Sequence, residues 1–320
     1  MRAVVFPMAK VALVALAAAA VWVAGAGLTP QPAAAYPFWA QQTAPETPRE
    51  DTGRIVCANC HLAQKEAEVA VPQSVTPDSV FKAVVEIPYD TELQQVMADG
   101  SRGELNVGAV LMLPEGFEIA PEERIPEAMQ EEVGDVFFQP YSADKPNIVL
   151  VGPLSGKEHQ EIAFPVLSPD PEASEDRYYG KFPVYLGANR GRGQLYPDGS
   201  RSNNAVQKAS ASGTIAAIAE REAGGYEVTI QPQAGEPTTD TIPAGPEPIV
   251  TEGDAVEAGD ALTEDPNVGG FGQEETEIVL QDPTRIKWLM GFLGLIALAQ
   301  IFLILKKRQV ERMQAAEMDL

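Results

Sequence analysis

Hydrophobic residues between positions 36 and 284 fall in short β-prone runs, separated by turns rich in proline, glycine, asparagine and aspartate. Regular spacing of short strands and turns is typical of an all-β sandwich or barrel. We expect a short helix within residues 122–136, whereas residues 205–222 fit a helical pattern only ambiguously. The runs that predict strands are 79–89, 108–117, 147–154, 161–167, 181–193, 226–232 and 277–283.

The composition changes over residues 205–264, which are rich in alanine, threonine, proline, glutamate and glycine. Within this stretch, residues 247–263 have the pattern strand, turn, strand, with glycine–aspartate pairs at both 253–254 and 259–260 as turns. We therefore expect a small β domain over residues 205–264. It would be inserted into a large β domain formed by residues 36–204 and 265–284.

The first 35 residues have the pattern of a secretory signal peptide. Two basic residues lie among the first ten, residues 11–28 are apolar, and an alanine triplet ends at Ala35. A basic start, an apolar run and a small-residue exit predict cleavage after Ala35, so that the mature chain begins at Tyr36. The apolar run is also long enough for a first transmembrane helix, but the prolines and alanines that follow it favour a processing site.

A second apolar segment, Trp288–Leu305, lies near the C-terminus. Its length as a helix would be roughly 27 Å, about one hydrocarbon core. The basic cluster at residues 306–308 follows it, and such clusters stay on the cytoplasmic side of a membrane. We expect residues 286–305 to form a transmembrane helix, residues 306–320 to form a cytoplasmic tail, and the bulk of the chain to be exported.

The exported part is strongly acidic. The whole chain has a net charge of −23, and the signal segment, the start of the anchor and the tail together carry +5, which leaves −28 on residues 36–284. A surface of this charge repels nucleic acid and anionic lipid, so phosphate recognition is excluded. The apolar content is ordinary and the acidic residues are dispersed, which indicates a folded domain.

Candidate chemistry is concentrated in the motif C-x-x-C-H, formed by Cys57, Cys60 and His61. A disulfide across two residues would close a small strained loop, and a thiol oxidoreductase would need a βαβ context that this chain lacks. Zinc needs four ligands, and the chain offers these three and His159. In C-x-x-C-H the two thiols can form thioethers with one haem, and the histidine can bind its iron. We therefore favour covalent haem attachment.

The residue types alone do not decide which group is the sixth ligand of that iron. Candidates are Met97, Met112, Met129, His159 and the α-amino group that cleavage would create at Tyr36. Met112 lies in an apolar strand pattern, where a core thioether is the expected role. Burial would lower the pKa of an α-amino group towards its neutral, ligating form. The aromatic residues that follow the cleavage site could instead belong to an ordinary packed N-terminal strand.

Several long motifs resemble the cytochrome f family over nearly the whole chain. They are YPFWAQQ at 36–42, PRE-x-TGRIVCANCHLA at 48–63, LNVGAVLMLPEGF at 105–117, NRGRGQLYPDGS-x-SNN at 189–204, and PNVGGFGQ-x(2)-TEIVLQDP at 266–283. The resemblance implies an elongated all-β exported part, with an immunoglobulin-like sandwich as the large domain, an inserted small barrel-sandwich domain, and one C-terminal transmembrane helix. It implies one covalently bound haem c and no enzymatic activity of the subunit itself.

The resemblance also implies roles for individual residues. Cys57 and Cys60 would form the thioethers, and His61 and the α-amino group of Tyr36 would be the axial iron ligands. The residues that would shield the haem are Tyr36, Pro37, Phe38, Pro153, Tyr196 and Pro197, and those that would hold a buried water chain are Gln95, Asn189, Gln194, Asn204 and Asn267. From the sequence alone, those five would have been assigned to turns in glycine-rich loops.

Partners and location follow from the same resemblance. The subunit would sit in the thylakoid membrane with cytochrome b and the Rieske protein of the cytochrome bf complex, with its bulk in the lumen and its C-terminus on the cytoplasmic or stromal side. It would pass electrons from the Rieske protein to plastocyanin or a soluble c-type cytochrome. Plant members carry a lysine patch where this chain has Gln94, Ser101 and Arg102, so we expect a neutral or cationic acceptor. The alternative is an exported thiol oxidoreductase, or another haem protein, that uses the same motif.

Overall fold

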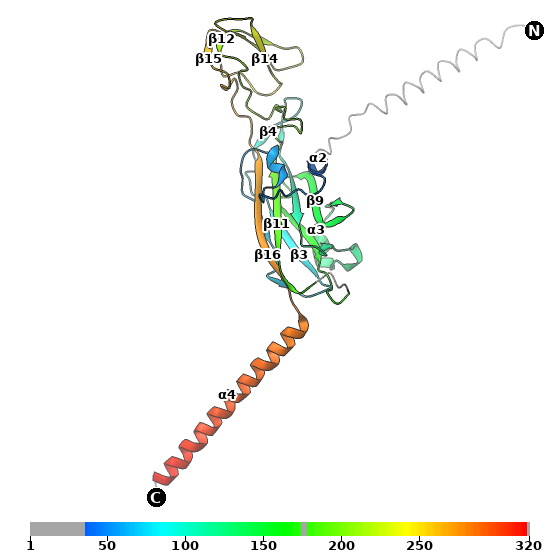
Figure 1. Cartoon of the computed structure of the whole chain (residues 1–320), viewed down its shortest axis with the longest axis vertical. Helices are drawn as coiled ribbons and strands as arrows, with labels where there is room; N and C mark the ends of the chain where they lie inside the picture. Colours follow the sequence, from blue (N-terminus) through cyan, green and yellow to red (C-terminus); the bar gives the residue numbers. More distant parts are fainter. Residues whose placement is uncertain (1–35, 174–177, 319–320) are drawn as a thin grey trace, which may run out of the picture.

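The computed structural model describes residues 36–173 and 178–318, with side chains from Trp39 onward. The predicted signal peptide, residues 1–35, lies outside the described residues. The described chain is elongated and built almost entirely of β-sheets, and one long helix, α4 (Pro283–Met318), leaves it at one end (Figure 1). The all-β class predicted from the strand pattern is confirmed.

Two sheets pack face to face to form the larger part of the molecule. One is six-stranded, with the order β2-β16-β11-β6-β9-β8, and the other is four-stranded, with the order β1-β3-β10-β7. The strands of the first are β2 (Ser74–Val75), β16 (Gly270–Leu280), β11 (Gly180–Arg190), β6 (Asn106–Met112), β9 (Lys145–Ser155) and β8 (Phe138–Ser142). Those of the second are β1 (Glu68–Ala70), β3 (Val80–Glu86), β10 (Glu161–Leu167) and β7 (Glu118–Ile119). All pairings are antiparallel except that of β2 with β16.

The main core lies between these two sheets. Alternate residues of β3 point inward, as a strand with one buried face requires, and they meet Phe164 of β10 and Leu186 of β11 in one cluster. Phe164 is fully buried and its ring packs on Phe138 with centroids 5.0 Å apart. Burial of this much apolar surface is the main stabilising contribution to the sandwich.

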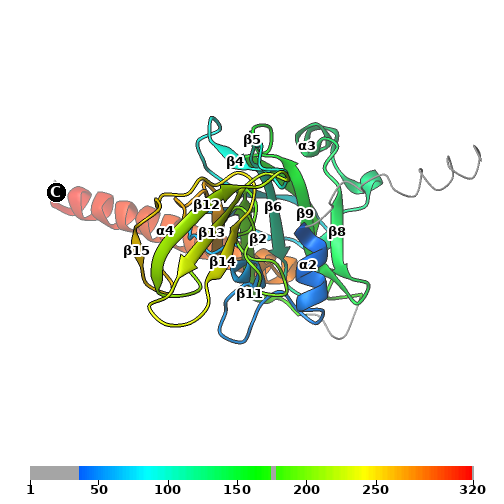
Figure 2. The ribbon, with the colours of Figure 1, turned by 90° about the horizontal axis from the view of Figure 1, so that it is seen from above.

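The six-stranded sheet is also covered on its outer face, and this second face supports the site described below. Along β6, Ala109 and Leu111 belong to the main core, whereas Val110 and Met112 belong to a second cluster beneath the short helix α2 (Tyr36–Thr43). Seen from above, α2 lies beside β8 and β9 (Figure 2). Burial on both faces explains why the sequence of β6 is apolar at nearly every position.

A separate four-stranded sheet forms the opposite end of the molecule from α4. Its order is β14-β13-β12-β15, with β12 (Gly213–Glu220), β13 (Tyr226–Gln231), β14 (Thr238–Ile242) and β15 (Ala255–Val256) around a core of its own. The helical pattern noted over residues 205–222 is wrong, because the chain there forms β12 and pairs with β13. The turns predicted at Gly253 and Gly259 are confirmed, and both glycines have a φ of 97° that other residues rarely adopt.

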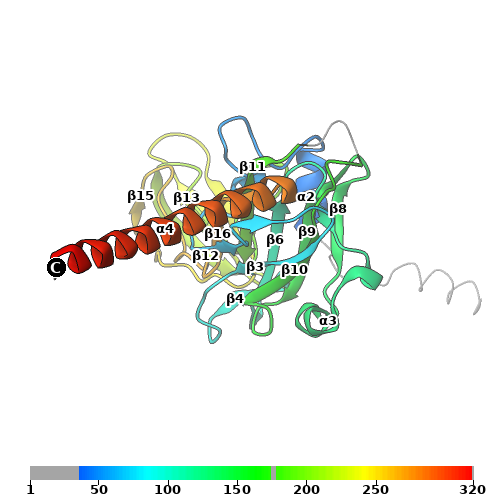
Figure 3. The same ribbon diagram turned by 90° about the horizontal axis from the view of Figure 1, so that it is seen from below.

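Short elements complete the fold. The helix predicted within 122–136 is confirmed as α3 (Glu127–Val133), preceded by the 3₁₀ helix η2 (Glu122–Arg124), and α3 lies beside β10 (Figure 3). The hairpin of β4 (Gln94–Val96) and β5 (Arg102–Glu104) lies near the junction with the small sheet. There, the Asn203 side-chain amide donates hydrogen bonds to the carbonyl oxygens of Met97 (2.7 Å) and Ala244 (2.9 Å).

Helix α4 contains the segment predicted to span a membrane. It begins where the Asp282 carboxylate accepts hydrogen bonds from the backbone N–H groups of Thr284 (2.8 Å) and Arg285 (3.2 Å), with Pro283 as the first helical residue. Within the described chain it is the one helix that is long and apolar enough to cross a membrane, and none of its residues is buried. An apolar helix without protein contacts indicates lipid as its surroundings.

Candidate haem site

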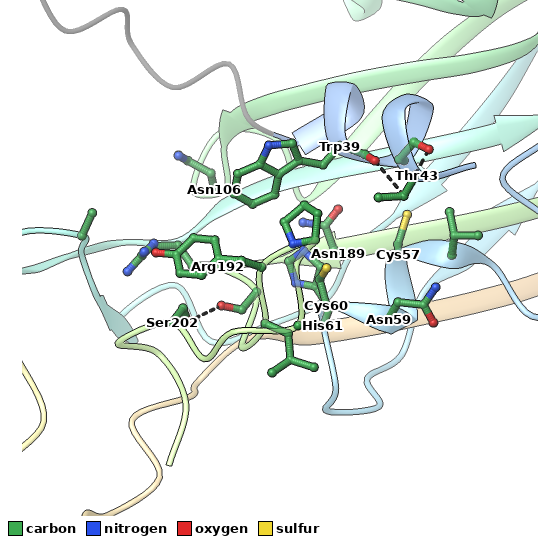
Figure 4. Close-up of a pocket in the computed structure, with 18 of the residues that line it drawn as sticks. Trp39, Thr43, Cys57, Asn59, Cys60, His61, Asn106, Asn189, Arg192 and Ser202 are labelled. Carbon is green, nitrogen blue, oxygen red and sulfur yellow. Dashed lines mark hydrogen bonds between the residues drawn. The ribbon is translucent and has the colours of Figure 1, made fainter. Parts of the chain in front are cut away.

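A cavity of about 680 Å³ lies on the outer face of the six-stranded sheet, under α2. Segments far apart in the sequence form its wall: the end of α2, the C-x-x-C-H motif, the end of β11 and the loop that follows β11 (Figure 4). Most of the lining surface is apolar, and the volume lies within the range of cavities that bury an organic ligand.

The motif enters this wall as a single tight turn. Residues Val56–Asn59 form the 3₁₀ helix η1, and the backbone N–H groups of Cys60 (3.2 Å) and His61 (3.0 Å) both donate to the carbonyl oxygen of Cys57. Cys57, Cys60 and His61 all line the cavity. The Arg54 guanidinium donates to the Ala58 carbonyl (2.9 Å) and to the Asn59 side chain, which holds the turn from its solvent side.

A glycine, Gly193, lies where the loop after β11 crosses the motif at close range. An added Cβ on Gly193 would lie 3.3 Å from both the Cβ and the carbonyl oxygen of Cys60. The Gln194 backbone N–H donates to that same carbonyl oxygen at 2.8 Å. The loop therefore packs directly on Cys60 and fixes where its side chain enters the cavity.

Both cysteines are free thiols, and their surroundings disfavour the thiolate. Burial raises the pKa of Cys57 to about 12 and also raises the pKa of Cys60. A thiol oxidoreductase requires the opposite shift, which a nearby cation or a helix N-terminus would produce. Both thiols line one cavity and are two residues apart in the C-x-x-C spacing of thiol oxidoreductases, but their raised pKa values make them poorly suited to thiol–disulfide exchange.

His61 is buried at the base of the motif and is 8 % exposed. Burial lowers the pKa of its imidazole to about 4, because the charged ring would lose its hydration. The ring is therefore neutral at physiological pH, which is the form that binds a metal. A buried, neutral imidazole beside two thiols fits a histidine that would bind a haem iron.

The opposite wall is formed by α2, where the structure corrects one expectation. The stretch that begins at Tyr36 is a helix, and the packed N-terminal strand considered from its aromatic residues is wrong. Trp39, Ala40 and Thr43 line the cavity, and the Trp39 ring meets Tyr196 edge to face with centroids 5.8 Å apart. Tyr36, Pro37 and Phe38 are the first residues of α2, although their side chains lie outside those described.

Of the other candidates for a sixth ligand, one lines the cavity and three do not. Met97 lines the cavity, with its sulfur packed against Gly103, since an added Cβ there would lie 2.8 Å from it. Met112 is buried in the cluster beneath α2, as its apolar pattern suggested. Met129 is in α3, and the His159 ring nitrogen Nδ1 lies 2.9 Å from the Ser155 carbonyl oxygen; neither residue lines the cavity.

Of the five polar residues named by resemblance, Gln95 and Asn189 line the cavity, and Gln194, Asn204 and Asn267 are not among the lining residues. Three of the five bind the backbone of Arg192: its N–H donates to Gln95 Oε1 (2.7 Å), and its carbonyl accepts from Gln194 Nε2 (3.1 Å) and Asn204 Nδ2 (2.8 Å). Asn204 Nδ2 also lies 3.4 Å from Asn267 Oδ1, which extends the network towards Gly269.

Two atoms of this group have no hydrogen-bond partner among the described residues. They are Asn189 Nδ2, in the cavity wall, and Asn204 Oδ1, and both side chains are buried. Buried polar groups are rarely left unsatisfied without an ordered water or ligand. Asn189 Nδ2 and Asn204 Oδ1 are therefore open hydrogen-bonding positions, the first of them on a residue that lines the cavity.

The remaining predicted residues divide into two groups. Tyr196 and Pro197 line the cavity, whereas Pro153 is exposed on β9 and is not part of the wall. Arg192 also lines the cavity, and sequence reasoning missed it. Its guanidinium Nη1 donates to Val96 O (2.8 Å) and Asn203 Oδ1 (2.6 Å). An isolated arginine in a glycine-rich loop has no local pattern that would have marked it.

The fold and the site together define a class of protein: a c-type cytochrome with one apolar helix at its C-terminus. Two neighbouring thiols and a neutral buried imidazole, set in the wall of a largely apolar cavity, form the donor set that a covalently attached haem requires. Among the described residues there is no group of three or more histidine, cysteine, aspartate or glutamate side chains that could hold a metal ion.

Comparison with known proteins identifies the particular family. The family models for the N-terminal and C-terminal parts of apocytochrome f match residues 36–191 and 203–320. The chain is 68 % identical to cytochrome f of Mastigocladus laminosus over 294 residues, which cover 91 % of this chain and 88 % of that protein. It is 62 % identical to cytochrome f of Trichormus variabilis over 316 residues, which cover 98 % and 95 %. The chain belongs to the cytochrome f family.

Proposed function

We propose that this chain carries electrons from the Rieske iron–sulfur protein of the cytochrome bf complex to plastocyanin or a soluble c-type cytochrome. The family supports a c-type cytochrome of that complex. One observation carries the proposal: Cys57, Cys60 and His61 line one largely apolar cavity of haem-compatible size. The chain would be an electron-transfer subunit and not itself an enzyme.

The residues of the motif would hold one haem c. The thiols of Cys57 and Cys60 would hold the haem through one thioether bond each. His61 would provide one axial ligand, and the α-amino group of Tyr36 would provide the other from the start of α2. When bound, the haem iron supplies a reversible one-electron redox change.

Cleavage after Ala35 would be required for this ligand set, because a peptide nitrogen cannot replace a free amine. The match of the N-terminal family model begins at residue 36, which supports that processing site. We propose that Tyr36, Pro37 and Phe38, at the start of α2, shield the haem from one side. Tyr196 and Pro197, which line the cavity, would shield it from the other, and the shielding role of Pro153, outside the cavity wall, rests on the resemblance alone.

Gln95, Asn189, Gln194, Asn204 and Asn267 would hold a chain of buried waters. The open hydrogen-bonding positions at Asn189 Nδ2 and Asn204 Oδ1 support this role. Such waters would leave each buried polar atom satisfied and would connect the cavity with the region near Gly269. Their order would keep the polar wall of the cavity in one arrangement in both redox states.

Helix α4 and the family support a placement in the membrane. We propose a single span in the thylakoid membrane, with the sheets in the lumen and residues 306–320 on the cytoplasmic or stromal side, where the basic cluster favours them. The two sandwich sheets would correspond to the large domain, residues 36–204 and 265–284, and the β12–β15 sheet to the small domain, residues 205–264. Cytochrome b and the Rieske protein would be its neighbours.

The acidic surface would select among soluble acceptors. Residues 36–284 carry −28, and the β4–β5 hairpin presents Arg102 where a lysine patch would otherwise lie. We expect faster electron transfer to a cationic acceptor at low salt, with a rate that falls as salt is added, because screening weakens the attraction. A steep fall of the rate with an acidic plastocyanin would contradict this expectation.

The decisive test is the spectrum of the purified mature protein. A pyridine haemochrome of the c type, with the haem retained after denaturation in acid acetone, would support covalent attachment at Cys57 and Cys60. The double variant Cys57→Ser/Cys60→Ser should lose this retained haem. A colourless mature protein whose two thiols are both open to alkylation would overturn the proposal and favour a thiol-based function.

A further inference from the structure

Tyr141, outside the haem-binding motif, connects α2 to the sheet beneath it by hydrogen bonds. Tyr141 is in β8, on the outer face of the six-stranded sheet, and is 3 % exposed. Its hydroxyl lies 2.8 Å from the carbonyl oxygen of Ala40 and 2.6 Å from that of Ala44. In return, the Gln41 side-chain amide donates to the backbone carbonyl of Tyr141 at 2.7 Å.

The ladder between β8 and β9 is interrupted at Tyr141. Its register shifts from the pair Pro140–Val149 to the pair Ser142–Lys145, and Tyr141 has no ladder partner between them. At this irregularity the Tyr141 carbonyl accepts from Gln41. The contact joins residues about one hundred positions apart in the chain.

The helix needs such a contact. An eight-residue helix is marginal on its own, and a chain terminus frays unless something holds it. Among the residues of this segment whose side chains the structure describes, Ala40 in α2 and Ala44 just after it pack on the cluster below. Burial also raises the pKa of Tyr141 to about 12, so that the hydroxyl remains a donor throughout the physiological range.

We propose that Tyr141 is a positioning residue that holds α2 over the haem cavity and thereby strengthens the binding of the iron by the α-amino group of Tyr36. The inference rests on the proposed function. Ala40, whose carbonyl receives the Tyr141 hydroxyl, is four residues beyond Tyr36, or about 6 Å along the helix axis. Ala40 also lines the cavity. The hydrogen bonds of Tyr141 and Gln41, together called the α2 clamp, therefore lie about one helical turn from the ligating nitrogen of Tyr36. Loss of order at Ala40 would for this reason weaken the binding of the iron by that nitrogen.

The test measures how easily an added ligand displaces the native one. The full-length, matured holoprotein would be titrated in its ferric state with cyanide, and the change in the Soret band would be recorded. The Tyr141→Phe variant keeps the ring and loses the hydroxyl. We expect cyanide to displace half of the native ligand at a concentration roughly 5-fold lower than in the unmodified protein, equivalent to about 1 kcal/mol. Gln41→Met, which removes the reciprocal hydrogen bond from the partly exposed side, should shift it in the same direction by roughly 2-fold.

The matched control is Tyr226→Phe. It removes a tyrosine hydroxyl from the small sheet, where Tyr226 packs on a separate core. Its cyanide titration should equal that of the unmodified protein. If Tyr141→Phe and Gln41→Met titrate like the unmodified protein while their melting temperatures fall, Tyr141 is only structural and the inference is overturned. An equal shift in Tyr226→Phe would overturn it as well.

The same experiment separates this inference from the proposed function. A c-type, six-coordinate spectrum in the unmodified protein, combined with unchanged cyanide titrations in both α2-clamp variants, refutes only the role of Tyr141. An unmodified protein without a c-type spectrum refutes the proposed function and the inference together. If Tyr141→Phe fails to mature, the Gln41→Met titration decides the question by itself.

Discussion

Gln273 offers a sharp test of how the β-sandwich supports the haem motif. Its side chain lies at the surface of β16, yet Oε1 accepts a hydrogen bond from the backbone N–H of Ile55 (3.1 Å) and Nε2 donates to the carbonyl of Gly53 (3.1 Å). Ile55 is 1 % exposed and comes two residues before Cys57. One side chain thus holds the segment that enters the motif from 218 positions away.

Replacement of Gln273 by methionine removes both hydrogen bonds and keeps the length of the side chain. The Gly53 carbonyl is partly exposed and can accept from water, whereas the Ile55 N–H is buried and is left without an acceptor. An unsatisfied buried donor costs about 1–3 kcal/mol. We therefore expect Gln273→Met to lower the free energy of unfolding by about 2 kcal/mol, which corresponds to a melting temperature roughly 4–8 °C lower for a protein of this size.

The assay is thermal and urea unfolding of the full-length holoprotein in detergent, followed by circular dichroism. Gln273→Glu is the matched variant because it keeps the acceptor for Ile55 and loses only the donor to Gly53. In about 0.5 M salt, which screens the added charge, it should stay within about 0.5 kcal/mol of the unmodified protein. Equal losses in the two variants would show that the buried Ile55 N–H is not what Gln273 satisfies, and the reasoning would be refuted.

Three further predictions address the site and the core. In the folded haem-free chain, iodoacetamide at pH 8 should alkylate both thiols far more slowly than in the denatured chain. Burial raises both pKa values, and a pKa of about 12 at Cys57 leaves on the order of one thiolate in 10⁴ molecules. Equal alkylation rates in the two states would contradict the burial argument. His61 is neutral in both the folded and the unfolded haem-free chain above its unfolded pKa of 6.5, but between pH 6.5 and about 4 the unfolded state alone takes up the proton. Stability measured by urea unfolding should therefore fall by up to about 3 kcal/mol over that window, and His61→Gln should remove most of this pH dependence; an unchanged dependence in that variant would assign it to other groups. In the core, Phe164→Ala should cost about 3–5 kcal/mol, whereas Phe137→Ala, at a side chain 76 % exposed, should change stability by less than about 0.5 kcal/mol; similar losses would mean that burial does not govern this region.

Local patterns were sufficient for several features of this protein. The alternating and continuous apolar runs marked β3, β6, β9, β10, β11 and β13 within a few residues, because a strand with a buried face imposes its period directly on the sequence. The membrane helix and its basic border are likewise local, since a span requires one uninterrupted apolar segment. The C-x-x-C-H motif is local too, because both thiols and the imidazole must reach one porphyrin from a single turn.

Other features depended on partners far away in the chain. The alanine-rich stretch that contains β12 has a helical pattern, but pairing with β13 and burial of Ile215 outweigh that weak preference. The aromatic and proline-containing start of α2 resembles a strand, and its helical form is stabilised by Tyr141 and by the cluster beneath it. Local sequence encodes propensities of a few tenths of a kcal/mol per residue, and tertiary contacts exceed them.

The cavity itself was decided by the tertiary structure. The motif predicted which residues would bind haem, but nothing local indicated that Trp39 would meet Asn189 and Arg192 around it. Trp39 lies in α2, whereas Asn189 and Arg192 lie at the end of β11 and just after it, and their convergence follows from strand register and from packing on both faces of the six-stranded sheet. Register and two-sided burial are properties of the whole fold, because each depends on contacts between segments that local sequence does not specify.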